Sequence, residues 1–234
     1  MRYIPILLLF VSCSTVYVPN TRNTPLFREQ GEAQISGYIT SGGLEAQGAY
    51  ALTDHLAVIG SYVYGSQKNT YKNTDYDWKN SFGEVGLGYF NRSRAARYEV
   101  FVGYGIGQGT SLDQYSFFGL NNTVVATGKR SRLFIQPSIG TNNRDFNIAF
   151  TPRLAYVDFS EFSTSSATTK PKYSGQLFVD PAITTKFRLA GNLHGIFQLG
   201  LTVPIPGEVY YKYSAMQVAL GIQIDTGGLR TRVY

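Results

Sequence analysis

The sequence predicts an all-β protein, an antiparallel up-and-down transmembrane β-barrel of about ten strands that follows an N-terminal extended lipid tether. Ten stretches of the chain alternate apolar and polar residues with a period of two, which places successive side chains on opposite faces of a β-strand. In none of them does the apolar face carry a charged residue, and no helical stretch separates them. Short and long connections alternate between the stretches, as they do in barrels of bacterial outer membranes.

Residues 1–12 are predicted to be a lipoprotein signal peptide. The apolar run from Ile4 to Val11 follows a single positive charge and is too short for a spanning helix, which needs roughly 20 apolar residues. Cys13, the only cysteine, follows this run behind a small residue, in a segment that looks like a bacterial lipobox. Acylation would make Cys13 the new N-terminus and anchor the chain, at ~0.8 kcal/mol per buried methylene. The alternative is an ordinary secretory signal in which the cysteine is incidental.

Residues 13–30 are predicted to be the lipidated tether between the acyl chains and the first strand. From Ser14 on, the segment is polar, rich in Asn, Thr and Pro, and without periodicity. Neither Ser14 nor Thr15 is acidic, so nothing resembles the aspartate that retains lipoproteins at the inner membrane, and outer-membrane lipid is the expected partner. Residues 31–225 are the predicted barrel domain and 226–234 a C-terminal tail. The 18 Tyr, 15 Phe and 15% charged residues of the chain suit a β-rich domain.

Each predicted strand has an apolar face that is expected to point outward, toward lipid. The last strand shows it most plainly, because Met216, Val218 and Leu220 alternate with Gln217 and Ala219. The outward residues of the strands are, in chain order, Ala33, Ile35, Gly37, Ile39; Leu44, Ala46, Gly48, Tyr50, Leu52; Leu56, Val58, Gly60, Tyr62, Tyr64; Gly83, Val85, Leu87, Tyr89; Tyr98, Val100, Val102, Tyr104, Ile106; Leu133, Ile135, Pro137, Ile139; Ile148, Phe150, Pro152, Leu154, Tyr156; Leu177, Val179, Pro181, Ile183, Phe187; Leu193, Gly195, Phe197, Leu199, Leu201, Val203; and Met216, Val218, Leu220, Ile222, Ile224.

The connections predict which end of the barrel faces the periplasm. Short connections occur at 53–55, 91–97, 142–145 and 189–192, and long ones at 66–80, 109–130, 160–174 and 204–214. A first hairpin near 41–43 is a short exception on the long side. Because long loops of such barrels face outside, and an even number of strands returns the chain to its starting end, both termini are expected at the periplasmic, short-turn end.

The inward face is predicted to hold a polar cluster that fills the lumen. Glu45, Glu84, Arg153 and Asp180 all lie roughly seven or eight residues from the short turns, so they should share one height in the barrel. Arg153 is expected at the centre, because a guanidinium offers five donors to surrounding carboxylates. Amides on the same face come from Gln47, Gln136, Gln198 and Gln217.

No enzyme activity is predicted from this cluster, and no cofactor or metal site is found. A hydrolase needs a nucleophile, a base and an orienting group together. Of the two histidines, His55 falls in a short turn and His194 near the periplasmic end, away from the long loops where barrel enzymes of this size place their sites. A lipid-active barrel enzyme and a narrow channel remain as alternatives, the latter weakened because barrels of about eight strands are filled by their own side chains.

Three prolines inside predicted strands, Pro137, Pro152 and Pro181, support a different alternative. Proline gives up a ladder donor and normally sits at edges or bulges, so β-bulges or a seam between the sixth and eighth strands are expected. A soluble periplasmic lipoprotein with a lipocalin-like barrel and a small apolar ligand would also alternate. Its exterior, however, should be dense in Lys and Glu, whereas the polar face here is mostly Gly, Ala, Ser and Gln.

The charges and aromatic residues outside the strands suggest contact surfaces. Tyr, Trp and Phe residues in the long connections could contact a partner, or pack on one another. The net charge of +6 comes partly from arginines at the short turns, which could meet lipid phosphates or a periplasmic or outer-membrane protein partner. Nucleic acid is not expected, because the chain is predicted to be exported and carries no recognition motif.

Two stretches of the chain carry a family resemblance: the run from Cys13 to Asn20, continued by Asn23-Thr24-Pro25 and Gly31-Glu32, and the run from Glu45 to His55. They resemble a family of uncharacterised Gram-negative outer-membrane lipoproteins with a predicted β-barrel. The likeness extends over most of the mature chain and implies export, lipidation and a barrel. It implies no activity, and only Cys13, as acylation site, is carried over. Gly227-Gly228 and two arginines interrupt the alternation that barrels usually show before a final aromatic residue such as Tyr234.

Overall fold

A computed structural model describes residues 16–71, 74–117, 120–143, 145–164, 167–169, 175–205, 209, 211 and 213–226. The strands are β1 Ala33–Thr40, β2 Gly43–Ala51, β3 Leu56–Tyr71, β4 Thr74–Arg92, β5 Ala96–Phe117, β6 Leu120–Thr141, β7 Phe146–Thr151, β8 Leu154–Thr164, β9 Ala167–Thr169, β10 Gly175–Val179, β11 Ala182–Ala190, β12 Leu193–Leu201, β13 Val203–Pro204 and β14 Met216–Asp225. None of the described residues belongs to a helix that is long and apolar enough to span a membrane.

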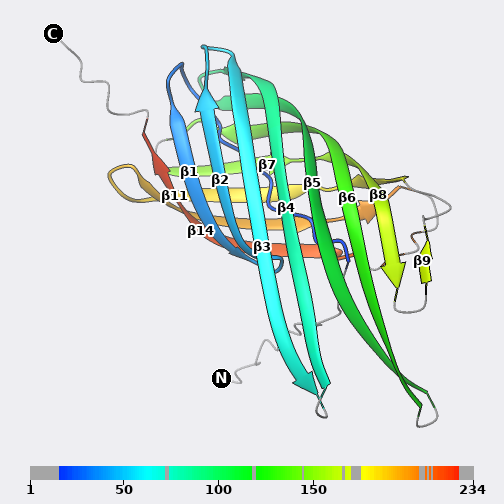
Figure 1. Cartoon of the computed structure of the whole chain (residues 1–234). Coiled ribbons are helices and arrows are strands. Elements are labelled where there is room, and N and C mark those ends of the chain that lie inside the picture. Colours follow the sequence, from blue (N-terminus) through cyan, green and yellow to red (C-terminus); the bar gives the residue numbers. More distant parts are fainter. Residues whose placement is uncertain are drawn as a thin grey trace, which may run out of the picture.

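The strands form one closed antiparallel barrel with a wall of ten strands, which confirms the predicted fold class (Figure 1). β1 to β6 pair in chain order, and β14 closes the barrel by pairing with both β1 and β12. In the rest of the wall, each of three positions in the strand order is occupied by two short strands that follow one another in the sequence. β7 continues into β8 beside β6, β10 into β11, and β12 into β13. The small strand β9 pairs only with β8.

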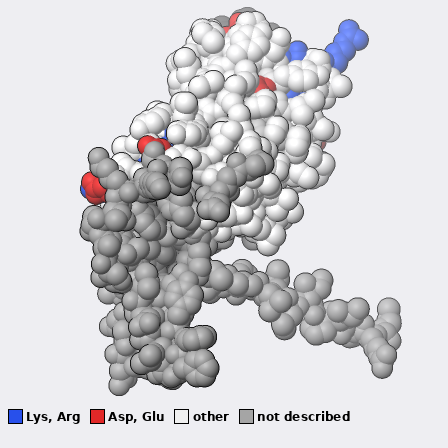
Figure 2. Space-filling model, turned by 90° about the vertical axis from the view of Figure 1, so that its right-hand side faces the viewer, with Lys and Arg blue, Asp and Glu red and all other residues white. Residues whose placement is uncertain are grey.

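The apolar side chains of the wall point outward, as the alternation predicts. Ile35, Val85 and Leu220 are each more than 60% exposed, while their neighbours along the strands point into the barrel. Figure 2 shows a broad uncharged area on the face it views, with acidic and basic side chains toward its margins. Charged side chains such as those of Glu84 and Arg153 therefore lie inside a wall whose outer surface is apolar, unlike the exterior of a water-soluble fold.

Two of the three strand prolines lie at breaks between strands. Pro152 separates β7 from β8, and Pro181 separates β10 from β11. Pro137 stays within β6, between the residues that pair with β8 and those that pair with β7. The register shift of the β6–β8 pairing lies between Lys129 and Arg130, away from the expected bulges at the prolines. Because Pro152 and Pro181 lie at strand breaks, their missing N–H groups remove no hydrogen bond from within a strand.

Two of the predicted long connections are largely strand. β3 and β4 remain paired as far as Tyr71 and Thr74, and β5 and β6 as far as Phe117 and Leu120. These hairpins extend beyond the rest of the wall at one end (Figure 1). Residues 66–80 and 109–130 were expected as loops because their alternation is weak, but continued ladder pairing with a neighbouring strand does not require an apolar face.

The segment Val16–Phe27, here called the lumen segment, runs through the inside of the barrel. Every one of its residues is buried. Arg130 donates to the carbonyl of Val16 at 3.0 Å and Ser214 to that of Tyr17 at 2.9 Å, both at the long-loop end. The segment ends at the short-turn end, five residues before β1. The predicted tether is thus extended, but most of it fills the lumen instead of spacing the barrel from a lipid.

Candidate functional site

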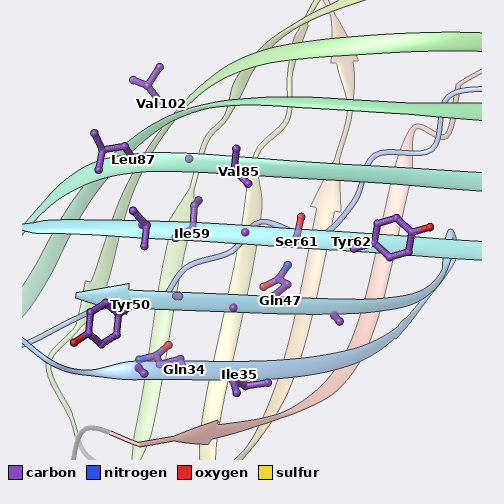
Figure 3. Close-up of a pocket in the computed structure, with 17 residues that line it drawn as sticks. Gln34, Ile35, Gln47, Tyr50, Ile59, Ser61, Tyr62, Val85, Leu87 and Val102 are labelled. Atoms are coloured by element: carbon purple, nitrogen blue, oxygen red, sulfur yellow. The ribbon is translucent and has the colours of Figure 1, made fainter. Parts of the chain in front are cut away.

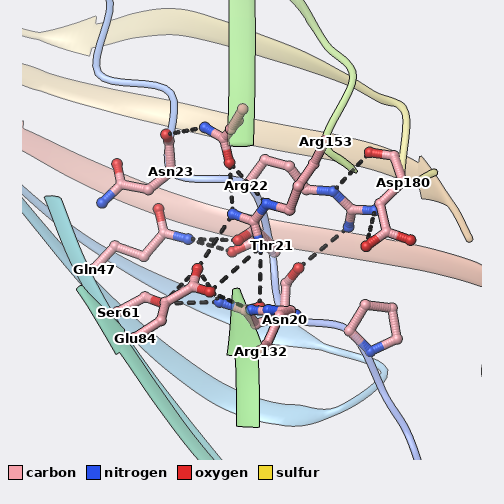
Figure 4. A network of polar contacts seen from close by, with 12 residues as sticks. Asn20, Thr21, Arg22, Asn23, Gln47, Ser61, Glu84, Arg132, Arg153 and Asp180 are labelled. Atoms are coloured by element: carbon pink, nitrogen blue, oxygen red, sulfur yellow. Dashed lines mark hydrogen bonds and ion pairs between the residues drawn. The ribbon is translucent and has the colours of Figure 1, made fainter. Parts of the chain in front are cut away.

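The middle of the lumen is a polar network between the lumen segment and the wall (Figure 4). Because the segment is extended, its successive side chains and peptide groups reach different strands. Asn20 and Thr21 face β2 to β4, whereas Arg22 faces the strands from β10 to β14. The segment therefore joins opposite sides of the wall at one height.

Glu84 of β4 is the acidic centre of this network. Its carboxylate accepts a hydrogen bond from Asn20 Nδ2 at 2.8 Å and forms an ion pair with Arg153 at 3.2 Å. It also forms an ion pair with Arg132 of β6. All three charged side chains are at most 2% exposed, so the pairing takes place away from bulk water. Two buried guanidinium groups therefore share one carboxylate.

Arg153 occupies the break between β7 and β8. Its Nε and Nη2 donate to Gln136 Oε1 at 2.9 and 2.5 Å, and its guanidinium lies 4.5 Å from the centre of the Phe134 ring. The backbone N–H of Asp180 donates to the carbonyl of Arg153 at 2.7 Å, and the reverse bond is 3.2 Å long. This pair of bonds carries the ladder across two interrupted strands.

Arg22 lies against the second group of interruptions. Its Nε donates to the Asp180 carbonyl at 3.2 Å and its Nη2 to the Leu201 carbonyl at 3.1 Å, at the ends of β10 and β12. Nη1 donates to Gln217 Oε1 at 2.6 Å, and the carboxylate of Asp180 lies 3.9 Å from Nη2. The Arg22 N–H donates to Gln198 at 2.7 Å. One side chain of the lumen segment thus binds three consecutive wall positions.

Glu45 holds the lumen segment on the opposite side. It accepts hydrogen bonds from Thr21 N at 3.0 Å and Thr21 Oγ1 at 2.6 Å. Gln47 donates to Glu45 at 2.9 Å and also to Thr21. Among the described residues, no Lys, Arg or His side chain lies within ion-pair distance of Glu45. Its carboxylate is therefore stabilised by hydrogen bonds alone.

The four predicted cluster residues all face the lumen, with exposures of 0 to 4%. Arg153 meets Glu84, as predicted, and meets Asp180 through the backbone. The structure does not bring Glu45 to Arg153, and the carboxylate of Asp180 pairs with Arg22 instead. The sequence did not reveal Arg22 or Arg132. Arg132 keeps the inward phase of β6 one residue before Leu133 and could have been found, whereas the lumen segment has no periodicity that would place Arg22.

Apolar clusters lie on both sides of the polar network. Toward the long-loop end, Val16 and Tyr17 pack with Phe159, Phe178 and Tyr211. Toward the short turns, a cluster surrounds Phe27 and contains Ala49, Ala51, Ala57, Ile59, Phe90, Phe101, Phe134 and Ala155. The lumen segment therefore contributes to three successive layers, apolar, polar and apolar.

Both histidines lie away from the polar network. His55 stacks on Tyr89 at the turn before β3, and His194 lies 3.5 Å from Asp225 near the other end of the chain. Neither contacts the polar network. No group of three or more His, Cys, Asp or Glu residues that could hold a metal occurs in the described part of the chain. Cys13, the predicted acylation site, lies outside the described residues.

The described surface includes two hollows. A shallow apolar depression of about 880 Å³ lies on the outward face of β1 to β5, around Gly48 and Gly60, with Tyr62 at one side (Figure 3). A polar pocket of about 560 Å³ lies at the short-turn end, between the end of the lumen segment and the wall. This second hollow is here called the mouth pocket.

No family model and no curated protein matches the sequence. Among solved structures, the translocator domain of autotransporter NalP from Neisseria meningitidis is similar, with a TM-score of 0.44 and 8% identity over 83% of this chain and 86% of that chain. The P. putida toluene transporter TodX has a TM-score of 0.30 and 9% identity over 91% and 94%. OmpT, an outer-membrane protein of Vibrio cholerae, has a TM-score of 0.22 and 9% identity over 83% and 96%. At these values the likeness goes no further than the barrel.

Proposed function

We propose that this chain is an integral outer-membrane β-barrel lipoprotein, acylated at Cys13, whose lumen is sealed by its own N-terminal segment. Its role is structural or accessory, through contacts with membrane lipid and with an outer-membrane or periplasmic protein, rather than catalytic. The single observation that carries this proposal is the combination of an apolar outer wall with a lumen filled by the buried segment Val16–Phe27.

The outer wall supports insertion into a bilayer. Large apolar side chains such as Ile39, Ile106 and Met216 are more than half exposed around the barrel. A monomeric soluble protein rarely exposes a continuous apolar patch above a few hundred Å². A soluble lipocalin-like barrel would reverse this arrangement and keep an apolar cavity inside, where this protein has the ion pairs of Glu84.

The lumen segment argues against transport. A barrel of ten strands is already narrow, and here Asn20, Thr21 and Arg22 occupy its polar middle layer. Conduction would require these hydrogen bonds and the adjacent apolar contacts to break together. We therefore propose a structural role in preference to transport.

The path of the lumen segment also suggests which leaflet of the outer membrane would hold the acyl chains of Cys13. Val16 follows Cys13 by three positions, a distance of at most about 11 Å in an extended chain. Val16 lies at the long-loop end, whereas β14 ends at the short turns. With short turns in the periplasm, the acyl chains would enter the outer leaflet. This differs from the sequence-based expectation of two periplasmic termini, and only the C-terminal end is proposed to stay there.

Extraction and gel migration test the integral barrel. The Cys13→Ala protein is expected to stay in membranes after carbonate or urea treatment, and to migrate faster unheated than boiled. Release of the variant by carbonate would contradict a membrane barrel. Mass spectrometry of the wild-type N-terminus tests acylation separately, because a barrel without acyl chains would still resist extraction.

Epitope tags test the sidedness. A tag inserted between Ser14 and Thr15 should be labelled on intact cells, whereas a tag after Tyr234 should need permeabilised cells. The opposite pattern would mean that the barrel is inverted. A protected N-terminal tag together with a protected C-terminal tag would mean that the segment does not cross the lumen.

A crosslink tests the position of the lumen segment directly. The hydroxyl oxygens of Thr24 and Thr184 lie 3.4 Å apart. In the double variant Thr24→Cys and Thr184→Cys, made in the Cys13→Ala background, a disulfide is expected to form in nearly all molecules. The control pair Thr24→Cys and Thr53→Cys, with the second residue in an exposed turn, should remain reduced. Free thiols in the first pair would contradict the lumen path.

A further inference from the structure

The mouth pocket at the short-turn end is lined by more basic than acidic side chains. It lies between residues 25–34 and the ends of β5, β11, β12 and β14, and its volume is about 560 Å³. The basic residues that line it are Arg28, Arg92, Arg97, Lys186 and Arg188, and the acidic ones are Glu29, Glu32 and Asp225. Pockets of this volume hold small ligands.

Lys186 is the buried basic group of this pocket. It comes from the inward face of β11 and is only 6% exposed, yet it lines the pocket. Among the described residues, no carboxylate lies within ion-pair distance of its ammonium and no hydrogen bond to it is formed. Glu99, buried in the same end of the lumen, accepts the N–H of Leu26 at 2.8 Å through one carboxylate oxygen, and its other oxygen has no hydrogen-bond partner among the described residues. An ammonium with three donors is rarely buried without a partner, because its desolvation is unfavourable.

Arg97 adds a second positive charge that no carboxylate neutralises by contact. Its guanidinium donates to the carbonyls of Leu26 and Asn143 and to the Asn142 side chain, at 2.7 to 3.2 Å. All three acceptors are uncharged. These bonds hold the group in place while two of its five N–H donors stay unused.

Two of the three acidic residues of the pocket have partners of their own. Glu32 accepts the N–H of Arg28 at 2.9 Å, and Asp225 lies 3.5 Å from His194. They do not reach Lys186 or Arg97 within ion-pair distance. The pocket therefore combines a buried ammonium and a fixed guanidinium, the two groups that proteins use most often for phosphate oxygens.

We propose that the mouth pocket binds a phosphate group, with Lys186 as its buried contact and Arg97 at its side. The phosphate can belong to a free anion in the periplasm or to a phospholipid headgroup, since the pocket opens at the short-turn end. This site is separate from the polar network around Glu84. It does not depend on acylation of Cys13.

Calorimetric titration of the purified full-length protein in detergent with inorganic phosphate tests the proposal. Saturable binding is expected, and Lys186→Met should weaken it about tenfold or more, as for loss of one charge-assisted contact. Lys129→Met is the matched control, because Lys129 is exposed and pairs with Glu161 at 2.9 Å, far from the pocket in the β6–β8 ladder. The control should bind phosphate like the wild type. Faster gel migration of unheated samples establishes that each variant is folded.

Arg97→Gln is a second variant, in case Lys186→Met does not fold, and should weaken binding several-fold. Reconstitution in vesicles of phosphatidylglycerol, followed by native mass spectrometry, distinguishes the two sources. Lipid that is retained by the wild type and lost from Lys186→Met identifies a headgroup, and binding of inorganic phosphate alone identifies a free anion. Absence of both from the wild type, or equal binding by the wild type and both variants, would overturn the proposal.

Discussion

The two halves of the barrel wall are built differently. From β1 to β6 the ladder is continuous, and each strand pairs with the next over its length. From β7 to β13 three wall positions are interrupted, at residues 152–153, 180–181 and 202. The continuous half supplies Glu45 and Glu84 to the lumen, and the interrupted half supplies Arg153 and Asp180 at the interruptions themselves.

This difference shows where the lumen segment is needed. In the continuous half Asn20 and Thr21 bind the carboxylates of Glu84 and Glu45, and Asn23 donates to backbone carbonyls of the intact β2–β3 ladder. In the interrupted half, backbone carbonyls of Asp180 and Leu201 accept from Arg22. The segment therefore lies over the first half and completes the second.

The largest effect is expected where the two halves meet, at Glu84. Glu84→Gln would leave Arg132 and Arg153 buried without a carboxylate, which costs about 3–5 kcal/mol for a broken buried ion pair. The measurement is the free energy of unfolding in urea, followed by gel migration of unheated samples. Glu161→Gln, which removes an exposed pair, should cost less than about 1 kcal/mol. Equal losses in the two variants would show that the halves are not coupled through Glu84.

A smaller effect is expected for Arg22→Met, which should destabilise only the interrupted half. The Asp180 carboxylate has no hydrogen bond among the described residues and would lose its ion pair, at about 2–3 kcal/mol together with the released carbonyls. Adding Asp180→Asn should restore part of this loss, because the unpaired charge is gone. Additive losses in the double variant would contradict a direct Arg22–Asp180 interaction.

The smallest effect is expected for the prolines. Pro152→Val and Pro181→Val each add a backbone N–H at a strand break that Arg153 and Asp180 already bridge with bonds of 2.7 and 3.2 Å. The unfolding free energy should therefore change by less than about 1 kcal/mol. A gain of about 2 kcal/mol or more would mean that proline, and not the lumen segment, determines the interruptions.

The sequence predicted the residues of the barrel wall more completely than the contacts inside the lumen. Alternation alone identified the outward residues of strands such as β14, because successive side chains of a strand point to opposite faces of the sheet. It placed Glu84 and Arg153 correctly, because inward charges in a narrow barrel have few directions to point. It could not show that Glu45 binds Thr21 or that Asp180 binds Arg22. A polar segment without periodicity has the same sequence pattern whether it lies in water or inside a polar lumen, so its location cannot be predicted from that pattern.

The lumen segment also joins the beginning of the chain to its end. Arg22 and Pro19 bind Gln198 and Gln217, which lie 176 to 198 residues further along the sequence. Contacts over such a sequence separation have a high loop-closure cost and can form only when β12 and β14 are in place. A chain that stops before β14 would therefore leave Arg22 and Pro19 without Gln217, so completion of the lumen network reports that the whole barrel has been made.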